Sequence, residues 1–129
     1  MRIDVSNTGM DYHAVSSTGK QASIVFGPDK PAEDTTMNPV ELFVAALGMC
    51  IAAMLRKFCT EHSLDAGGIT VALETDWEPG KPKCSFLNAK VRVEGDWDER
   101  RKAAFLKVAE TCPVHMTIAE CDRAQIEVL

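Results

Sequence analysis

The residues best suited to chemistry in this sequence are two cysteines, Cys50 and Cys112, which lie 62 residues apart. The thiolate, not the thiol, is the form of cysteine that attacks peroxides and disulfides. At an ordinary pKa near 8.5 only about 3% of a thiol is ionised at pH 7, and a pKa of about 6 raises that fraction roughly thirtyfold. Because an apolar environment raises a thiol pKa, a reactive Cys50 requires a cation or hydrogen-bond donors facing it.

Three further cysteines complete a total of five, namely Cys59, Cys84 and Cys121. An odd count without a secretory signal argues against a disulfide framework and favours free thiols. Cys59 follows Cys50 by nine residues and faces away from it on a helix, so we interpret it as core or surface. We interpret Cys84 as incidental, and we expect Cys121 to fill space, with a role as a third thiol left open.

Cys112 precedes Pro113 at a predicted helix break, where a thiol can meet the free amides of a helix N-terminus. His115 follows three residues later and could lower the pKa of Cys112 as an imidazolium; a packing role is as plausible. A zinc site from Cys112, His115 and Cys121 is a formal alternative, but the sequence has no C-x-x-C pair and no clear fourth ligand. We therefore expect no metal and no cofactor.

Cys50 lies in a segment with a well-marked helix start. Asn38 can cap, Pro39 suits the first helical position, and Glu41 completes a capping box. The predicted helix runs from Pro39 to about His62, and its first four turns are apolar all round, which predicts burial on several sides. For Glu41 a contribution to an active site is the alternative to capping.

The other predicted elements are strands and shorter helices. Alternating and β-branched residues predict strands, and caps with apolar periodicity predict helices. The strands are expected at 2–6, 11–17, 21–26, 69–77, 86–93 and 125–129; a second helix begins after Asp96 or Asp98, and a short third helix spans 113–119. This order predicts an α+β fold with mostly antiparallel sheets, formed by a single domain over residues 1–129. One such chain would struggle to cover the long central helix, so we expect a partner subunit.

Two motifs resemble those of the OsmC/Ohr family. Residues 38–50 read N-P-V-E-L-F-V-A-A-L-G-M-C, and residues 112–114 read C-P-V. The resemblance implies an OsmC-like fold, with antiparallel sheets around a buried central helix in an intertwined homodimer. It further implies thiol-dependent reduction of organic hydroperoxides in oxidative-stress defence, with Cys50 peroxidatic, Cys112 resolving, and a dithiol such as dihydrolipoamide or a lipoylated protein as reductant.

The sequence departs from the best-known members of that family at the groups that activate the thiol. Those members carry a glutamate ten residues before the first cysteine, where this chain has Val40, and an arginine in the N-terminal region, where it has only Arg2. The available glutamate is Glu41, nine residues before Cys50. The alternative hypothesis is therefore a non-catalytic OsmC-like dimer that senses redox state or binds a small apolar ligand.

Charge and hydropathy narrow the class of protein. The formal net charge of −5 and the isoelectric point of about 5.1 disfavour nucleic acid as a partner. Met1 to Asp4 are followed by no apolar segment typical of a signal peptide. The apolar run from Leu42 to Leu55 is shorter than the roughly 20 residues that span a bilayer. These features favour a soluble, cytoplasmic protein without a membrane partner.

Overall fold

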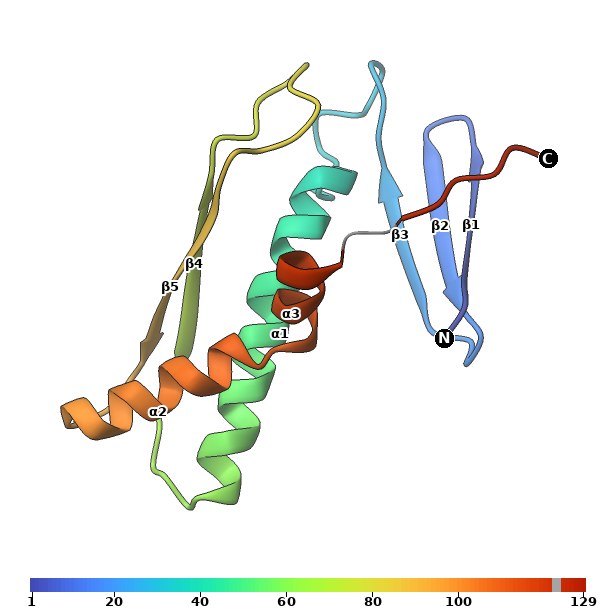
Figure 1. The fold of residues 1–129 in the computed structure, drawn as a ribbon. Helices are drawn as coiled ribbons and strands as arrows, with labels where there is room; N and C mark the ends of the chain where they lie inside the picture. Colours follow the sequence, from blue (N-terminus) through green and yellow to red (C-terminus); the bar gives the residue numbers. More distant parts are fainter. Residues whose placement is uncertain (122–123) are drawn as a thin grey trace. The chain divides into compact units, whose positions relative to one another are not determined.

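The fold is α+β, as a computed structural model that describes residues 1–121 and 124–129 shows (Figure 1). The chain divides into two compact units, residues 1–43 and 44–129. The elements are β1 (Ile3–Thr8), β2 (Asp11–Ser16), β3 (Gln21–Val25), α1 (Pro39–Glu61), β4 (Ile69–Thr75), β5 (Leu87–Val93), α2 (Glu99–Glu110) and α3 (Pro113–Glu120). The predicted fold class, strand positions and helix positions are thus confirmed, apart from the last strand.

The first unit is an antiparallel sheet in the order β1-β2-β3, followed by the start of α1. Ala14 pairs with Val5 on one side and with Ala22 on the other, so these three side chains share one face of the sheet. That face is mostly apolar; its members are Ile3, Val5, Tyr12, Ala14, Ala22 and Ile24, with Asn7 and Ser16 near its ends. Residues 1–43 contain no buried residue, so this face has no cover that removes it from solvent.

The capping box predicted for α1 is present. The Asn38 side-chain oxygen accepts a hydrogen bond from the Glu41 backbone N–H at 2.9 Å, and the Glu41 carboxylate accepts one from the Asn38 N–H at 2.8 Å. The helix ends at Glu61, and Ser63 follows with a φ of 52°, the left-handed conformation that stops a helix. Glu41 therefore has a structural role that its spacing from Asn38 predicted.

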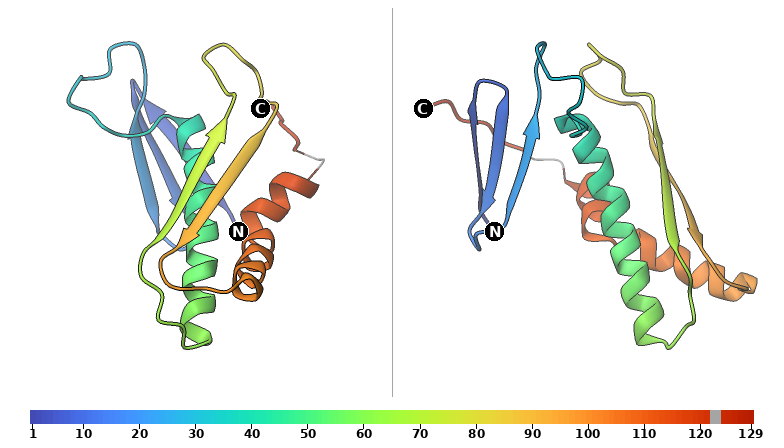
Figure 2. Two further views of the ribbon diagram at one scale, coloured as in Figure 1. Left: turned by 90° about the vertical axis from the view of Figure 1, so that its left-hand side faces the viewer. Right: turned by 180° about the vertical axis from the view of Figure 1, so that it is seen from behind.

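The second unit has its core on one stripe of α1. Leu47, Ile51, Leu55 and Cys59 are buried at intervals of four residues and pack with Phe105, Ala109 and Cys112. The two-stranded sheet β4–β5 covers one side of this part of α1, while α2 and α3 lie against another (Figures 1 and 2). One buried stripe accounts for only part of the apolar run. Phe43 and Met49 of α1 are 46% and 66% exposed, so the predicted burial on several sides is not found within one chain.

Gly48 allows α1 to approach β4 closely. A Cβ atom at this position would lie 2.7 Å from the Leu73 Cδ1 atom, which is closer than side chains tolerate. Glycine in a helix interior costs about 1 kcal/mol relative to alanine. The close packing of α1 on β4 accounts for a glycine in an otherwise strong helix.

The helices α2 and α3 follow each other with a sharp change of direction. The Asp98 carboxylate accepts the Arg101 N–H at 2.8 Å, so Asp98 rather than Asp96 caps α2. Pro113 opens α3 as its first helical residue, and Cys112 occupies the N-cap position without making a side-chain capping bond. The predicted helix break at Cys112 is therefore confirmed.

The predicted strand at residues 125–129 is wrong. Residues 124–129 have no regular structure, and Ile126, Val128 and Leu129 are exposed. Their alternation has the character of a strand, but strand propensity acts only where a neighbouring strand offers pairing.

The strand β4 ends at Thr75, two residues before the predicted end at Trp77. Asp76 turns the chain there, and its carboxylate accepts the Ser85 N–H at 2.7 Å.

The length of the apolar run does not by itself exclude a membrane span. With 23 residues, α1 is long and apolar enough to cross a bilayer by length and composition. The earlier expectation, that the apolar run from Leu42 to Leu55 is too short for this, is therefore corrected. The core helix of a soluble protein passes the same test. In this chain, Leu47, Ile51 and Leu55 are buried within unit 2, and 28% of the apolar window of α1 is buried in all.

Candidate redox site

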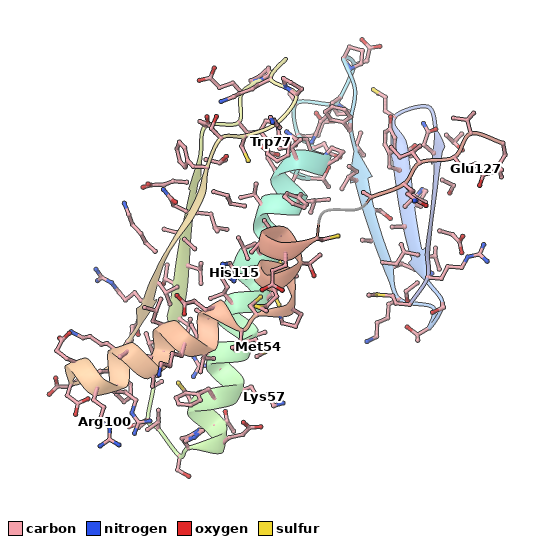
Figure 3. All side chains as sticks on the ribbon, in the orientation of Figure 1. Met54, Lys57, Trp77, Arg100, His115 and Glu127 are labelled. Atoms are coloured by element: carbon pink, nitrogen blue, oxygen red, sulfur yellow. The ribbon has the colours of Figure 1, made fainter. Side chains whose placement is uncertain are left out.

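Cys50 and Cys112 come from two helices of unit 2 that lie side by side. Cys50 lies on α1 beside the buried stripe and is partly exposed, whereas Cys112 is 0% exposed at the N-cap of α3. Both pack in the same apolar cluster, together with Met54 and Val114. Figure 3 labels Met54 on α1 and His115 on α3, the two helices that carry the pair.

The two thiols lie close to each other. The Cys112 side chain acts on the Cys50 thiol and raises its pKa, and neither residue is in a disulfide. The fold thus brings together two cysteines that are 62 residues apart, which their spacing alone could not guarantee. Of the three predicted site residues, these two form one group.

Burial raises the pKa of the Cys50 thiol above its ordinary value, and the hydrogen bond with Cys112 raises it further. The backbone N–H of Val114 donates to the Cys50 sulfur and acts in the opposite direction, lowering that pKa. A hydrogen bond to sulfur stabilises the thiolate, while an apolar environment disfavours it. Within one chain these effects together raise the pKa of Cys50, as expected for a thiol on an apolar helix.

The group that faces Cys50 is a backbone donor and not a cation. Among the residues that the structure describes, no lysine or arginine contributes to the shift in the Cys50 pKa. The nearest arginine along the chain, Arg56, instead donates to the carbonyl oxygens of Ala66 at 3.2 Å and Gly67 at 2.5 Å. The donor at Val114 was not identified from the sequence, although Pro113 at a helix start was the signal for it.

Glu41 does not join the two cysteines. Its carboxylate is committed to the capping box with Asn38, and no shift of the Cys50 pKa comes from it. Nine residues on a straight helix correspond to about 13.5 Å along the axis and half a turn around it, so Glu41 and Cys50 lie on opposite faces of α1. Within one chain, the capping role is the one that the structure supports.

The remaining candidates stand apart from the pair. His115 Nδ1 lies 2.9 Å from the Glu110 carbonyl oxygen, so it serves the α2–α3 junction. Cys59 is buried in the core, Cys84 is partly buried in the β4–β5 hairpin, and Cys121 is exposed at the end of α3. Within residues 1–121 and 124–129, no three His, Cys, Asp or Glu side chains gather to hold a metal ion.

Two cavities lie away from the cysteines. One of about 370 Å³ lies between β5 and α2 and is lined by Val91, Trp97 and Phe105, among others. Another of about 240 Å³ lies on the apolar face of the first sheet, against Pro39 and Leu42. Neither lining includes Cys50 or Cys112.

Comparisons with known proteins agree with this fold. The model of the family described as OsmC-like protein matches residues 32–127. A search of curated proteins gives no significant match. Among solved structures, the OsmC-like protein of Mycoplasma pneumoniae has a TM-score of 0.70 at 16% identity, with 94% of this chain and 89% of that chain covered.

Two other solved structures show the same fold at low identity. The organic hydroperoxide resistance protein OhrB of Bacillus subtilis has a TM-score of 0.56 at 20% identity, with 94% of this chain and 93% of that chain covered. An OsmC-like protein of unknown function from Vibrio cholerae has a TM-score of 0.60 at 15% identity, with 90% and 91% covered. At these identities the likeness concerns the fold.

Proposed function

The chain belongs to the OsmC-like protein family, and from this premise we propose that it reduces organic hydroperoxides with Cys50 as the attacking thiol and Cys112 as the resolving one. The proximity of the Cys50 and Cys112 side chains is the observation that carries the proposal. One fold relative is described as an organic hydroperoxide resistance protein. Fold likeness raises the prior for this chemistry without assigning it, so the residues must be tested directly.

The proposed reaction has three steps. The Cys50 thiolate attacks the outer peroxide oxygen, the O–O bond breaks, and the alcohol leaves after taking a proton, while Cys50 becomes a sulfenic acid. The Cys112 thiol then attacks the Cys50 sulfur, a disulfide forms and water leaves. A dithiol such as dihydrolipoamide reduces the disulfide by exchange and is itself oxidised to its cyclic disulfide.

The exposure of the two residues suits these roles. Cys50 is partly exposed, so a peroxide can reach it, whereas Cys112 is shielded from solvent beside Cys50. A sulfenic acid next to a protected thiol condenses before a second peroxide arrives, which limits over-oxidation. The apolar side chains around the pair, such as Met54 and Val114, favour a hydrophobic peroxide.

We extend the proposal to a homodimer in a reducing, cytoplasmic environment. The exposed apolar residues on α1, among them Phe43 and Met49, and the open face of the first sheet are surfaces of the kind that a partner subunit buries. A second copy could bury them and could bring its own charged groups to Cys50. The cysteines are free thiols, the form that a reducing compartment maintains.

The direct test is stopped-flow consumption of cumene hydroperoxide by the purified protein with dihydrolipoamide. We expect turnover in the native protein, loss of turnover in Cys50→Ser, and a single turnover followed by over-oxidation in Cys112→Ser. Cys84→Ser, which removes a thiol of the hairpin outside the pair, should keep the native rate. Equal rates for the native protein and Cys50→Ser would refute the proposed activity.

A second candidate function is redox sensing or binding of a small apolar ligand without turnover. The observation that favours it is the upward shift of the Cys50 pKa by burial, which leaves little thiolate at neutral pH. This function predicts slow disulfide formation between Cys50 and Cys112 with no sustained consumption of peroxide. Mass spectrometry of the oxidised pair, run beside the turnover assay, separates the two functions.

A further inference from the structure

The cavity between β5 and α2 lies wholly within unit 2 and has an apolar wall. Its volume is about 370 Å³, and ligand pockets in proteins occupy roughly 300–1,000 Å³. The apolar side chains of the wall come from β5, from the segment that leads into α2 and from α2 itself; they are Ala89, Val91, Val93, Trp97, Phe105 and Leu106. The cavity is therefore large enough for a small molecule with an apolar body.

Trp97 is held in this wall by three contacts. Its ring meets that of Phe105 edge-on, with ring centroids 5.4 Å apart, and its indole N–H donates to the Val93 carbonyl oxygen at 3.0 Å. The ring also lies against Gly95, where a Cβ atom would come within 2.5 Å of the Trp97 Cζ2 atom. Phe105 in turn meets Phe58 of α1 edge-on at 6.1 Å. These contacts come from the chain itself, so binding does not have to order the wall.

Two cations line the same cavity, Arg92 of β5 and Lys102 of α2. Lys102 forms an ion pair with Glu99 at 3.2 Å, but the two side chains are 58% and 92% exposed, and exposed ion pairs are weak. The Arg92 guanidinium makes no hydrogen bond or ion pair with any other residue that the structure describes. Its donors form a fork that fits the two oxygens of a carboxylate. Both cations are therefore available to an anion in the cavity.

The charge around the cavity is positive, in contrast to the charge of the whole chain. Residues 90–107 contain six lysines and arginines and four acidic residues, whereas the chain has a net charge of −5. Two of these acids serve the backbone, since Glu94 accepts the Gly68 N–H at 3.0 Å and Asp98 caps α2. Within the described part of the chain, no carboxylate lines the cavity. An anion is therefore attracted to this place without a negative group in the wall to oppose it.

We propose that this cavity binds a small amphipathic monocarboxylate, with its apolar body against Trp97 and its carboxylate at Arg92 and Lys102. Ligand sites typically combine a mostly apolar lining with a few polar groups that fix the orientation of the ligand. The apolar face of a second copy would cover the same wall, but it would leave both cations without partners, which costs desolvation free energy. The lining does not include Cys50 or Cys112, so the site is independent of the proposed peroxide reduction.

The first test uses the native chain labelled with ¹⁵N-tryptophan, which gives two indole signals because the sequence has two tryptophans. A Trp77→Phe variant assigns them. On titration with sodium octanoate, we expect the Trp97 signal to shift and saturate, while the signal of Trp77, which lies outside the cavity, stays in place. 1-Octanol, which has the chain without the charge, should bind about tenfold more weakly. A Trp97 signal that ignores octanoate, or that responds equally to octanol, would overturn the proposal.

The second test removes the cations one at a time. Arg92→Gln and Lys102→Gln should each weaken octanoate binding about tenfold, as for loss of a charge-assisted hydrogen bond, and should leave octanol binding unchanged. The matched control is Lys107→Gln, which makes the same change in net charge on the same helix but does not touch the lining of the cavity. It should keep the native affinity. If all three variants weaken binding equally, the net charge and not the cavity is responsible, and the proposal fails.

The third test fills the cavity. Ala89→Phe, at an exposed position of β5, places an aromatic side chain that suits a strand in the space of the ligand. We expect octanoate binding to be lost while the melting temperature stays near that of the native chain. If a second copy occupies the cavity instead, octanoate binding should weaken as the protein concentration rises, and Ala89→Phe should change self-association in sedimentation velocity; this result would contradict the proposal. Cys50→Ser should bind octanoate like the native chain, so failure here is distinct from failure of the proposed activity.

Discussion

The two sheets of this chain differ in how much of their apolar surface they bury. In unit 2, β4–β5 packs Val71 and Leu73 against the cluster around Leu47, Ile51 and Leu55. In unit 1, β1–β3 also has a mostly apolar face, yet residues 1–43 include no buried position. The difference shows that patterning decides which face of a sheet is apolar, and that a second element must still cover it.

The largest expected effect is on stability, and it distinguishes the two units by the same leucine-to-alanine change at two positions of α1. Leu55 is 0% exposed in unit 2 and Leu42 is 37% exposed in unit 1, and both belong to α1. We expect Leu55→Ala to lower the free energy of unfolding by about 3 kcal/mol, because it leaves a cavity in a packed core. Leu42→Ala should cost about 1 kcal/mol or less. Urea denaturation of both variants measures the difference, and equal costs would break the comparison.

The next effect concerns what covers the first sheet. If a second copy packs on its apolar face, Val5→Glu places a carboxylate in that contact and should weaken self-association at least tenfold, which is about 1.4 kcal/mol. Ser6→Glu, next to it on the opposite face, is the matched control and should leave association unchanged. Sedimentation velocity over a range of concentrations measures both. Identical behaviour of the two variants would exclude this face from the dimer.

The smallest effect separates the two roles considered for Glu41. Asn38→Ala removes the capping acceptor of the Glu41 N–H and should cost about 1 kcal/mol in the free energy of unfolding. Glu41→Gln keeps the capping box, so its stability should stay near that of the native protein. If Glu41→Gln nevertheless lowers peroxide turnover while thermal denaturation is unchanged, Glu41 acts at a redox site and not only as a cap.

Sequence reasoning succeeded where the signal is local or where a motif carries it. The capping box follows from the residue types at Asn38 and Glu41. Two motifs that resemble one family selected Cys50 and Cys112 as a candidate pair, but they left open whether the two thiols lie close together, which the structure shows. Sequence reasoning failed at residues 125–129, because alternation predicts a strand only if an edge is available for pairing.

A backbone group shows a different limit of sequence reasoning. The Val114 amide acts to lower the pKa of Cys50, against the larger effect of burial, and a backbone amide has no letter of its own in the sequence. Only the path of the chain from α2 into α3 determines which amide lies near Cys50.

The position of the two thiols also affects how strongly a disulfide between them would stabilise the folded chain. A bond between Cys50 and Cys112 would close a loop that includes the end of α1, both strands of the second sheet and all of α2. By loop-closure entropy, such a ring of roughly 60 residues disfavours the unfolded chain by about 4 kcal/mol. Because proteases cleave the unfolded chain, the disulfide form should be degraded more slowly than the dithiol form. The rate of degradation would then depend on whether the protein had been oxidised.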